Sequence, residues 1–85
     1  MEIVILPKAE EHLAFWKKNG NKIILKRVAL LIRAITENPF AGIGKPEPLK
    51  HELAGKWFRR IDKEHRLVYA IDNNILYIFA LKGHY

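Results

Sequence analysis

Residues 39–48, with the sequence Pro-Phe-Ala-Gly-Ile-Gly-Lys-Pro-Glu-Pro, contain three prolines and two glycines within ten positions. Proline fixes φ and lacks a backbone N–H, and glycine favours turns, so neither a helical nor a strand period continues through this stretch. We therefore expect an ordered loop that divides the 85-residue chain into two parts with different secondary structure. A loop of this kind is also a common place for functional side chains.

The part before the loop predicts one strand and two helices. Residues 2–6 are apolar and rich in isoleucine and valine, and the proline that follows suits the first turn of a helix over residues 7–19. Gly20 is expected to end that helix, and Asn21 to cap a second one that ends before Pro39. In the second helix, apolar residues recur at spacings of three and four: Ile24, Val28, Leu31, Ile32 and Ile35. Two helices joined by a short connection predict a hairpin packed on a sheet.

The part after the loop predicts three strands, at residues 56–61, 66–71 and 75–81, separated by short polar turns. Consecutive strands with short connections form an antiparallel meander. The expected fold class is therefore α+β, with an N-terminal strand, a two-helix hairpin packed on an antiparallel sheet, and a C-terminal three-stranded meander. A chain of this length is expected to form one domain, residues 1–85.

The composition is basic, with 15 Lys and Arg residues against 9 acidic ones, a formal net charge of +6 and a pI near 9.8. Such a surface attracts polyanions, and nucleic acid is the first partner to consider. The absence of cysteine excludes disulfides, thiolate zinc sites and cysteine nucleophiles. Charged residues interrupt every apolar stretch, so we expect a cytoplasmic protein without a membrane partner.

Two parts of the chain offer acid–base chemistry. Glu47 lies between Pro46 and Pro48, which restrict the backbone to extended conformations and hold the carboxylate away from the chain. His84 supplies an imidazole, the side chain whose ordinary pKa lies closest to neutrality, and Tyr85 supplies a ring that can stack on a base. The alternatives are a solvated loop glutamate and an inert chain end.

Three arginines flank the first hairpin turn and could bind phosphate oxygens: Arg59, Arg60 and Arg66. The alternative is that they protect a solvent-facing strand edge. With a four-residue turn, Arg59 and Arg66 share one face of the sheet and Arg60 points to the other, whereas a turn one residue longer reverses this. The sequence leaves open whether Arg59 or Arg60 faces the site.

Lys45 and Lys50 could contact phosphates as point charges, although either could equally be an ordinary surface lysine. Residues 42–45 resemble a phosphate loop but lack its glycine spacing and its Ser or Thr after the lysine. The four histidines have no recognised metal-ligand spacing. We therefore expect no metal and no cofactor.

Several segments, in order along the chain, resemble the YoeB/Txe toxins of the RelE superfamily: Gly44-Lys45-Pro46-Glu47-Pro48-Leu49-Lys50-His51, Trp57-x-Arg59-Arg60-Ile61, Glu64-His65-Arg66-Leu67-Val68-Tyr69 and His84-Tyr85. The resemblance runs from Pro39 to the last residue, with Trp16 and the helix pattern as weaker support. It implies a ribosome-dependent mRNA endoribonuclease of a toxin–antitoxin pair, a homodimer, and inhibition by a YefM-like antitoxin. Phe58 departs from a frequent serine, and Lys82-Gly83 replaces Arg-Tyr of some members.

The resemblance also implies roles for individual residues. Glu47 would be the general base, His84 the general acid and Arg66 the transition-state clamp, with Tyr85, Lys50 and Arg60 as supporting contacts. The chemistry needs no metal: a ribose 2′-oxygen attacks the adjacent phosphorus, and the products are a 2′,3′-cyclic phosphate and a 5′-hydroxyl. Two other functions remain open, a noncatalytic RNA- or ribosome-binding module and a domain that binds an acidic protein segment.

Overall fold

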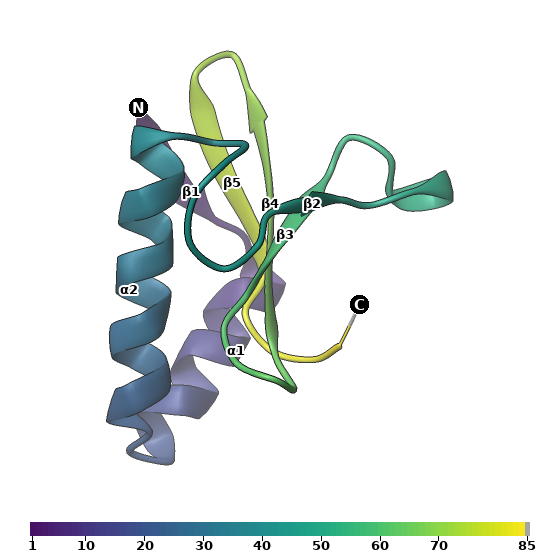
Figure 1. Cartoon of the computed structure of the whole chain (residues 1–85). Coiled ribbons are helices and arrows are strands. Elements are labelled where there is room, and N and C mark those ends of the chain that lie inside the picture. Colours follow the sequence, from purple (N-terminus) through teal and green to yellow (C-terminus); the bar gives the residue numbers. More distant parts are fainter. Residues whose placement is uncertain (85) are drawn as a thin grey trace.

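The computed structural model describes residues 1–84 and contains two helices and a five-stranded sheet (Figure 1). In chain order the elements are β1 (Glu2–Ile5), α1 (Pro7–Lys18), α2 (Lys22–Glu37), β2 (Glu47–Pro48), the 3₁₀ turn η1 (His51–Leu53), β3 (Trp57–Arg60), β4 (Arg66–Asp72) and β5 (Ile75–Ala80). The predicted α+β class, the helical hairpin and the C-terminal meander are confirmed. None of the helices in residues 1–84 is long and apolar enough to cross a membrane.

The sheet has the strand order β1-β5-β4-β3-β2. β1 pairs with β5 in parallel, and every other neighbouring pair is antiparallel, so the sheet is mixed rather than purely antiparallel. A second difference from the prediction lies in the Pro/Gly-rich segment, which was expected to contain no regular element. Its Glu47 and Pro48 form the short strand β2, which pairs with β3. A proline is tolerated there because β2 is an edge strand, where the missing N–H is not needed for pairing.

Local signals define the ends of both helices as expected. Pro7 begins α1, and Gly20 lies in the left-handed region with φ of 64°, where the chain leaves the helix. Asn21 caps α2, since its side-chain oxygen accepts the backbone N–H of Ile24 at 3.1 Å. The last hairpin turns at Asn73 and Asn74, both with positive φ, as a two-residue turn between twisted strands requires.

The two faces of the sheet differ in what covers them. The helices pack on one face and form the main core, with residues such as Leu31, Ile35, Leu67 and Ile78 fully buried. The opposite face carries a smaller cluster made of Phe58, Val68 and Ala80, with Leu49 and Phe79 packed against it. We call this second side the open face, and Figure 1 shows β2, η1 and the end of the described chain on the side away from α2.

Candidate active site

Strand pairing brings three of the predicted site residues to the open face. Directly paired residues in an antiparallel sheet place their side chains on the same face. Glu47 pairs with Phe58 of the open-face cluster, and Arg60, two residues further along β3, pairs with Arg66. Glu47, Arg60 and Arg66 therefore share one side of the sheet. They come from three adjacent strands, so their backbones are on the order of 10 Å apart, within reach of long side chains.

Of the two arrangements that the sequence left open, the structure has the one in which Arg60, and not Arg59, shares a face with Arg66. A four-residue turn would have paired Ile61 with Arg66, but the connection spans residues 61–65, and Arg60 opposes Arg66. The turn is longer because the backbone N–H groups of Ile61 and Asp62 both donate to the His65 carbonyl, at 3.0 and 3.3 Å. Since side chains alternate along a strand, this one-residue difference exchanges the faces of the two arginines.

Arg59 is fully buried on the helix side of the sheet. Its Nη2 donates to the carbonyls of Asn38 and Ala41, the latter at 2.9 Å, and its Nη1 donates to the Ile43 carbonyl at 3.1 Å. A guanidinium with these partners is not accessible to RNA. Arg59 is therefore not available as the RNA contact that we expected. Its hydrogen bonds instead fix the loop after α2 to the core.

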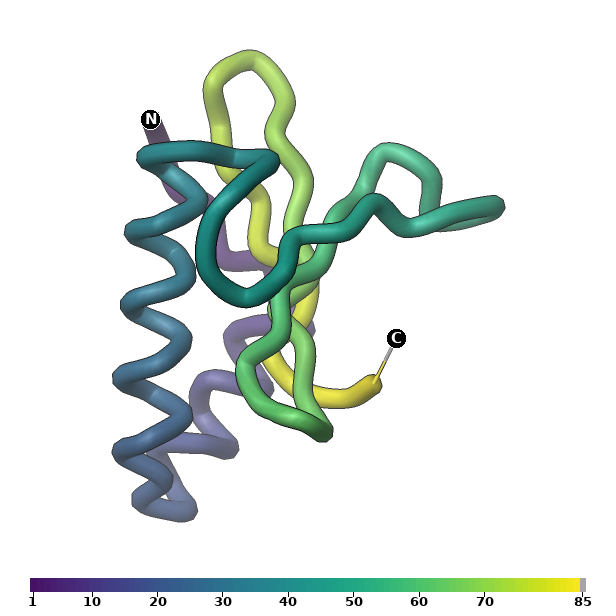
Figure 2. The backbone as a smooth tube through the Cα atoms, in the orientation of Figure 1, coloured from purple at the N-terminus to yellow at the C-terminus, as the bar shows by residue number. Residues whose placement is uncertain are grey.

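Tyr69 completes this internal anchor. Its hydroxyl accepts from Arg59 Nε at 3.4 Å and donates to the Pro39 carbonyl at 2.6 Å. Burial raises the pKa of the Tyr69 hydroxyl, against a smaller opposing effect of Arg59, so the phenol stays protonated and can donate. The loop held in this way curls between the end of α2 and β3 (Figure 2). Its last part joins the sheet, since the Gly44 carbonyl accepts the Arg60 N–H at 2.7 Å.

Arg66 has only 5% of its surface exposed, yet part of its guanidinium is unused. Nη1 donates to the carbonyls of Asp62 and His65, at 2.8 and 3.1 Å. The buried Nε has no hydrogen-bond partner among residues 1–84. The guanidinium carbon lies 5.9 Å from the centre of the Phe58 ring, on the open face. Because Nε itself is shielded from solvent, an anion would have to reach Arg66 through the small part of the side chain that is exposed.

The chain end runs beside Arg66. After β5, the Gly83 carbonyl accepts the backbone N–H of Arg66 at 2.9 Å. His84 follows directly and is exposed, so its imidazole is accessible next to β4. Tyr85 lies outside the described residues. Lys45 and Lys50 are both exposed and lie on either side of β2, three positions or fewer from Glu47.

Three residues that hold the chain end were not predicted as part of the site. Trp16 and His12 of α1 and His65 of the first hairpin turn bond the backbone of Leu81 and Gly83. Trp16 entered the sequence analysis only as weaker support for the resemblance and His65 only as part of a motif, and His12 had no role. Only its position four residues before Trp16, on the same side of a helix, could have indicated a shared partner.

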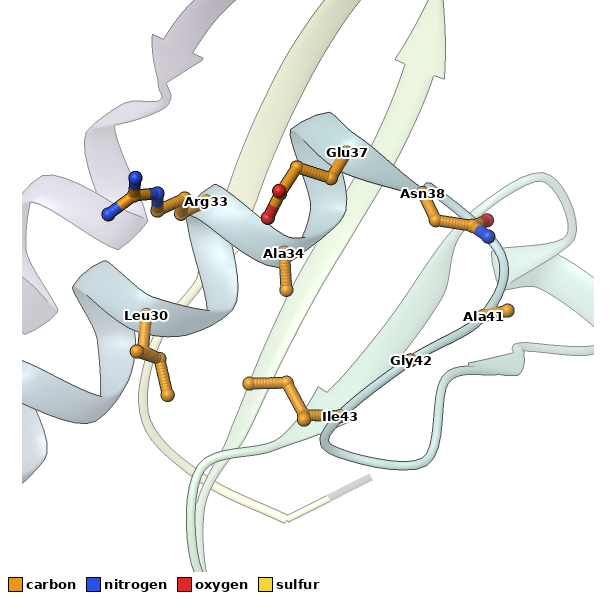
Figure 3. Close-up of a pocket in the computed structure, with 8 residues that line it drawn as sticks. All are labelled: Leu30, Arg33, Ala34, Glu37, Asn38, Ala41, Gly42 and Ile43. Carbon is orange, nitrogen blue, oxygen red and sulfur yellow. The ribbon is translucent and has the colours of Figure 1, made fainter.

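A groove of about 500 Å³ lies elsewhere, between the second half of α2 and the loop after it (Figure 3). Its walls include Leu30 and Ala34 of α2 and Gly42 and Ile43 of the loop. It is on the α2 side of the loop and contains neither Glu47 nor Arg66. Within residues 1–84, no three His, Asp or Glu side chains come together as a metal site would require.

Comparison with known proteins agrees with this fold and these motifs. The model of the YoeB-like toxins of bacterial type II toxin–antitoxin systems matches residues 6–85. Toxin YoeB of Synechocystis is 53% identical over 74 residues, which cover 87% of this chain and 86% of that protein. Toxin YoeB of Escherichia coli K12 is 41% identical over the full length of both chains.

Solved structures extend the likeness to three dimensions. A YoeB/ParE toxin from Agrobacterium tumefaciens superposes with a TM-score of 0.95 at 37% identity over the whole of both chains. The YoeB subunit of a Staphylococcus aureus YoeB-YefM complex gives a TM-score of 0.90 at 42% identity, covering all of this chain and 98% of that one. YafQ of E. coli, at 14% identity and a TM-score of 0.81, shares the fold. The sequence motifs, the fold and these relatives together show that the chain belongs to the YoeB family of toxins of bacterial type II toxin–antitoxin systems.

Proposed function

We propose that this toxin is a ribosome-dependent, metal-independent endoribonuclease that cleaves mRNA and so inhibits translation. The observation that supports the proposal is that Glu47 and Arg66 share the open face, while exposed His84 directly follows Gly83, whose carbonyl accepts the Arg66 N–H. Toxins of the RelE type are generally nucleases, which supports the same activity class. A noncatalytic RNA-binding module would need the cations but would have no use for Glu47 and His84 beside them.

The proposed reaction uses the RNA's own nucleophile. Glu47 accepts the proton of a ribose 2′-hydroxyl, and the 2′-oxygen attacks the adjacent phosphorus. Arg66 stabilises the negative charge that develops on the equatorial phosphate oxygens, and His84 donates a proton to the departing 5′-oxygen. The bond from phosphorus to the 5′-oxygen breaks, leaving a 2′,3′-cyclic phosphate and a 5′-hydroxyl. DNA lacks the 2′-hydroxyl, so it is not a substrate.

The remaining predicted site residues bind rather than react. Lys45 and Lys50, which flank β2 in the chain, and Arg60 of β3 are exposed cations, suited to contact neighbouring phosphates. Tyr85 is proposed to stack on a base next to the scissile bond. This division of roles predicts that removing one exposed cation weakens RNA binding modestly, whereas removing Glu47 or His84 reduces the chemical step.

The exposure of the two reacting groups supports the proposed dependence on the ribosome. Both Glu47 and His84 are exposed, so in the free protein water competes with the substrate for these groups. Docking in the decoding site would exclude that water and hold the 2′-hydroxyl in line with the leaving oxygen, and such positioning is worth several orders of magnitude in rate. Free RNA is then a poor substrate. The proposed location is the cytoplasm, where the ribosomes are.

The proposed partners are a second copy of this chain and a YefM-like antitoxin. Solved structures of the S. aureus relative include a YoeB dimer and a YoeB-YefM complex, and this chain is 41% and 42% identical to the YoeB chains in them. An acidic antitoxin segment would be attracted to the net charge of +6. By covering the open face, such a segment would block RNA access.

The test is to map mRNA 5′ ends in a translation extract with the wild type and with the Glu47→Gln and His84→Ala variants. Each variant should lose about 10² to 10⁴-fold in cleavage rate, the usual contribution of a general acid or base. Glu10→Gln, a neutralised exposed glutamate on α1, is the matched control and should cleave like the wild type. Thermal unfolding of all four proteins shows whether the fold is retained.

Two results would contradict the proposal. Cleavage by both active-site variants at the wild-type rate would remove the catalytic assignment. Equal rates on free mRNA and on translated mRNA would refute the coupling to the ribosome.

A further inference from the structure

At Leu81, directly after β5, side chains of α1 take the place of a neighbouring strand as hydrogen-bond partners of the backbone. The Leu81 N–H donates to His12 Nδ1 at 3.0 Å, and the Leu81 carbonyl accepts from Trp16 Nε1 at 2.9 Å. Both backbone polar groups of this buried residue are thus satisfied by α1, a helix near the other end of the chain. Buried backbone groups need such partners, so these two bonds determine the path of the chain at Leu81.

Gly83 is held in the same way, two residues further on. Its N–H donates to His65 Nδ1 at 3.0 Å, and its carbonyl accepts the Arg66 N–H at 2.9 Å. His65 also packs edge-to-face against Trp16, with ring centroids 4.8 Å apart. We call His12, Trp16 and His65 the tail clamp. Together with Arg66, the tail clamp binds all four backbone polar groups of Leu81 and Gly83.

Both imidazoles act as acceptors, and this requires one particular protonation state. A neutral imidazole accepts through one nitrogen and carries its proton on the other, whereas a protonated imidazole has two donors and no acceptor. With Nδ1 accepting in each ring, the protons of His12 and His65 reside on Nε2. Protonation of either ring would set an N–H against the N–H of Leu81 or Gly83 and break the bond.

We propose that the tail clamp positions the imidazole of His84, one residue beyond Gly83, for proton donation to the leaving oxygen. His12, Trp16 and His65 are positioning residues, because they act on the chain end and not on the RNA. The inference rests on the proposed nuclease activity. A displacement of about 1 Å in a reacting group can cost on the order of 10²-fold in rate, so loss of one clamp bond should be measurable.

Burial and the nearby lysines favour the neutral state of His12. Burial lowers the pKa of His12, and Lys82 and Lys8 lower it further, against an opposing effect of Glu11 and with a small contribution from His65. Beside His65, the exposed Glu64 carboxylate has its Oε2 3.8 Å from Nε2, the ring nitrogen opposite the one that accepts the Gly83 N–H. The acceptor facing Leu81 is therefore available near neutral pH and is lost in acid.

The test compares variants that keep or remove the acceptor. In His12→Asn and His65→Asn, the amide oxygen can take the place of Nδ1 but cannot titrate, whereas His12→Leu and His65→Leu have no acceptor. On translated mRNA, the Leu variants should lose about 10 to 100-fold in kcat with little change in KM, and the Asn variants should stay within about threefold of the wild type. Toward acid, His12→Asn should lose less activity than the wild type.

A second measurement separates positioning from general loss of structure. In a Glu47→Gln background, amide hydrogen exchange is measured with and without each Leu substitution. Exchange at Leu81 should accelerate in His12→Leu and at Gly83 in His65→Leu, while the core amides of Leu67 and Ile78 keep their protection. These amide readouts remain valid even if a Leu variant is less stable overall, because each is compared with the core amides of the same protein.

The outcomes are distinguishable. If the wild type fails to cleave translated mRNA, the proposed function fails, and with it the role of the tail clamp in catalysis. If the wild type cleaves and the Leu variants cleave equally fast despite faster exchange at the tail, positioning by the tail clamp is overturned. Unchanged exchange at Leu81 and Gly83 in the Leu variants would likewise overturn it.

Discussion

Arg59 and Arg60 show at the residue scale how two identical neighbours receive opposite roles. Arg59 is fully buried and donates to three loop carbonyls, whereas Arg60 is exposed beside Glu47 and Arg66 on the open face. Methionine has a similar length and no charge, so it removes the donors with little change in volume. The two Arg→Met variants therefore form a matched pair.

We expect Arg59→Met to lower the free energy of unfolding by about 2 to 3 kcal/mol, because the carbonyls of Asn38, Ala41 and Ile43 lose a buried donor. Arg60→Met should change stability by less than about 0.5 kcal/mol and should instead weaken RNA binding. Urea denaturation and RNA affinity are measured for both proteins. Equal stability losses in the two variants would contradict the assignment of faces.

At Gly44 the loop lies so close to the core that there is no room for a side chain. Its φ is 83°, and a Cβ built there would lie 2.9 Å from a Leu31 methyl carbon and 3.0 Å from Arg59 Cβ. Gly55 also has positive φ, 96°, but a Cβ there would meet nothing within 4 Å. Alanine substitution at the two positions therefore separates the stability cost of a positive φ from the cost of steric crowding.

Gly55→Ala should cost about 1 kcal/mol of stability, the lower end of left-handed strain, and Gly44→Ala should cost at least about 2 kcal/mol, because overpacking adds to it. Thermal or urea unfolding of both variants is the measurement. Since Gly44 also accepts the Arg60 N–H, its substitution should reduce cleavage as well. A Gly44→Ala protein as stable as Gly55→Ala would show that the loop can move away from α2.

At the scale of elements, the packing of α1 against the segment after β5 makes stability depend on pH through His12. The pKa of His12 is lowered in the folded protein from its ordinary value of 6.5, chiefly by burial. As the pH falls below 6.5, the unfolded chain therefore binds a proton that the folded protein still excludes. The stabilising contribution is complete above 6.5 and is lost as the pH falls toward the lowered value.

We expect the free energy of unfolding of the wild type to fall between about pH 7.5 and about pH 5.5, and the fall to be smaller in His12→Asn. Urea denaturation at the two pH values gives the comparison. His51→Asn is the control, because the His51 side chain is exposed and no hydrogen bond to it is seen in the described part of the chain. An identical fall in the wild type and in His12→Asn would rule out this contribution.

At the scale of the whole molecule, Met1 and the last described residues lie on different sides (Figure 1). Met1 precedes the edge strand β1, which is at the opposite end of the sheet order from β2, and the described chain ends with exposed His84 near the open face. Addition of a sequence to one end should therefore affect RNA access, and addition to the other should not.

A peptide tag fused after Tyr85 should suppress mRNA cleavage strongly, because the added chain would occupy the site beside His84. The same tag placed before Met1 should leave the rate near that of the untagged protein. Both fusions are assayed by mapping mRNA 5′ ends on ribosomes, with thermal unfolding as the check on folding. A fully active C-terminal fusion would contradict the placement of the site at the end of the chain.

Much of this protein could be predicted from local sequence, because the signals are local in origin. The Pro/Gly-rich loop separates helices from strands, the helical period defines α2, and the Asn73-Asn74 turn defines the last hairpin. The ordered motifs from Gly44 to Tyr85 were enough to indicate the toxin family, which the comparisons confirm. Each of these features depends on residues that are neighbours in sequence.

Only the tertiary structure decided which arginine faces the site and what holds the chain end. The arginine assignment depends on a single extra residue in the turn at 61–65, and a shift of one residue exchanges the two faces of a strand. The tail clamp depends on contacts between residues 65 and 69 positions apart, Trp16 and His12 with Leu81. No periodicity or short motif carries such information, because these pairs meet only when α1 packs against the folded sheet.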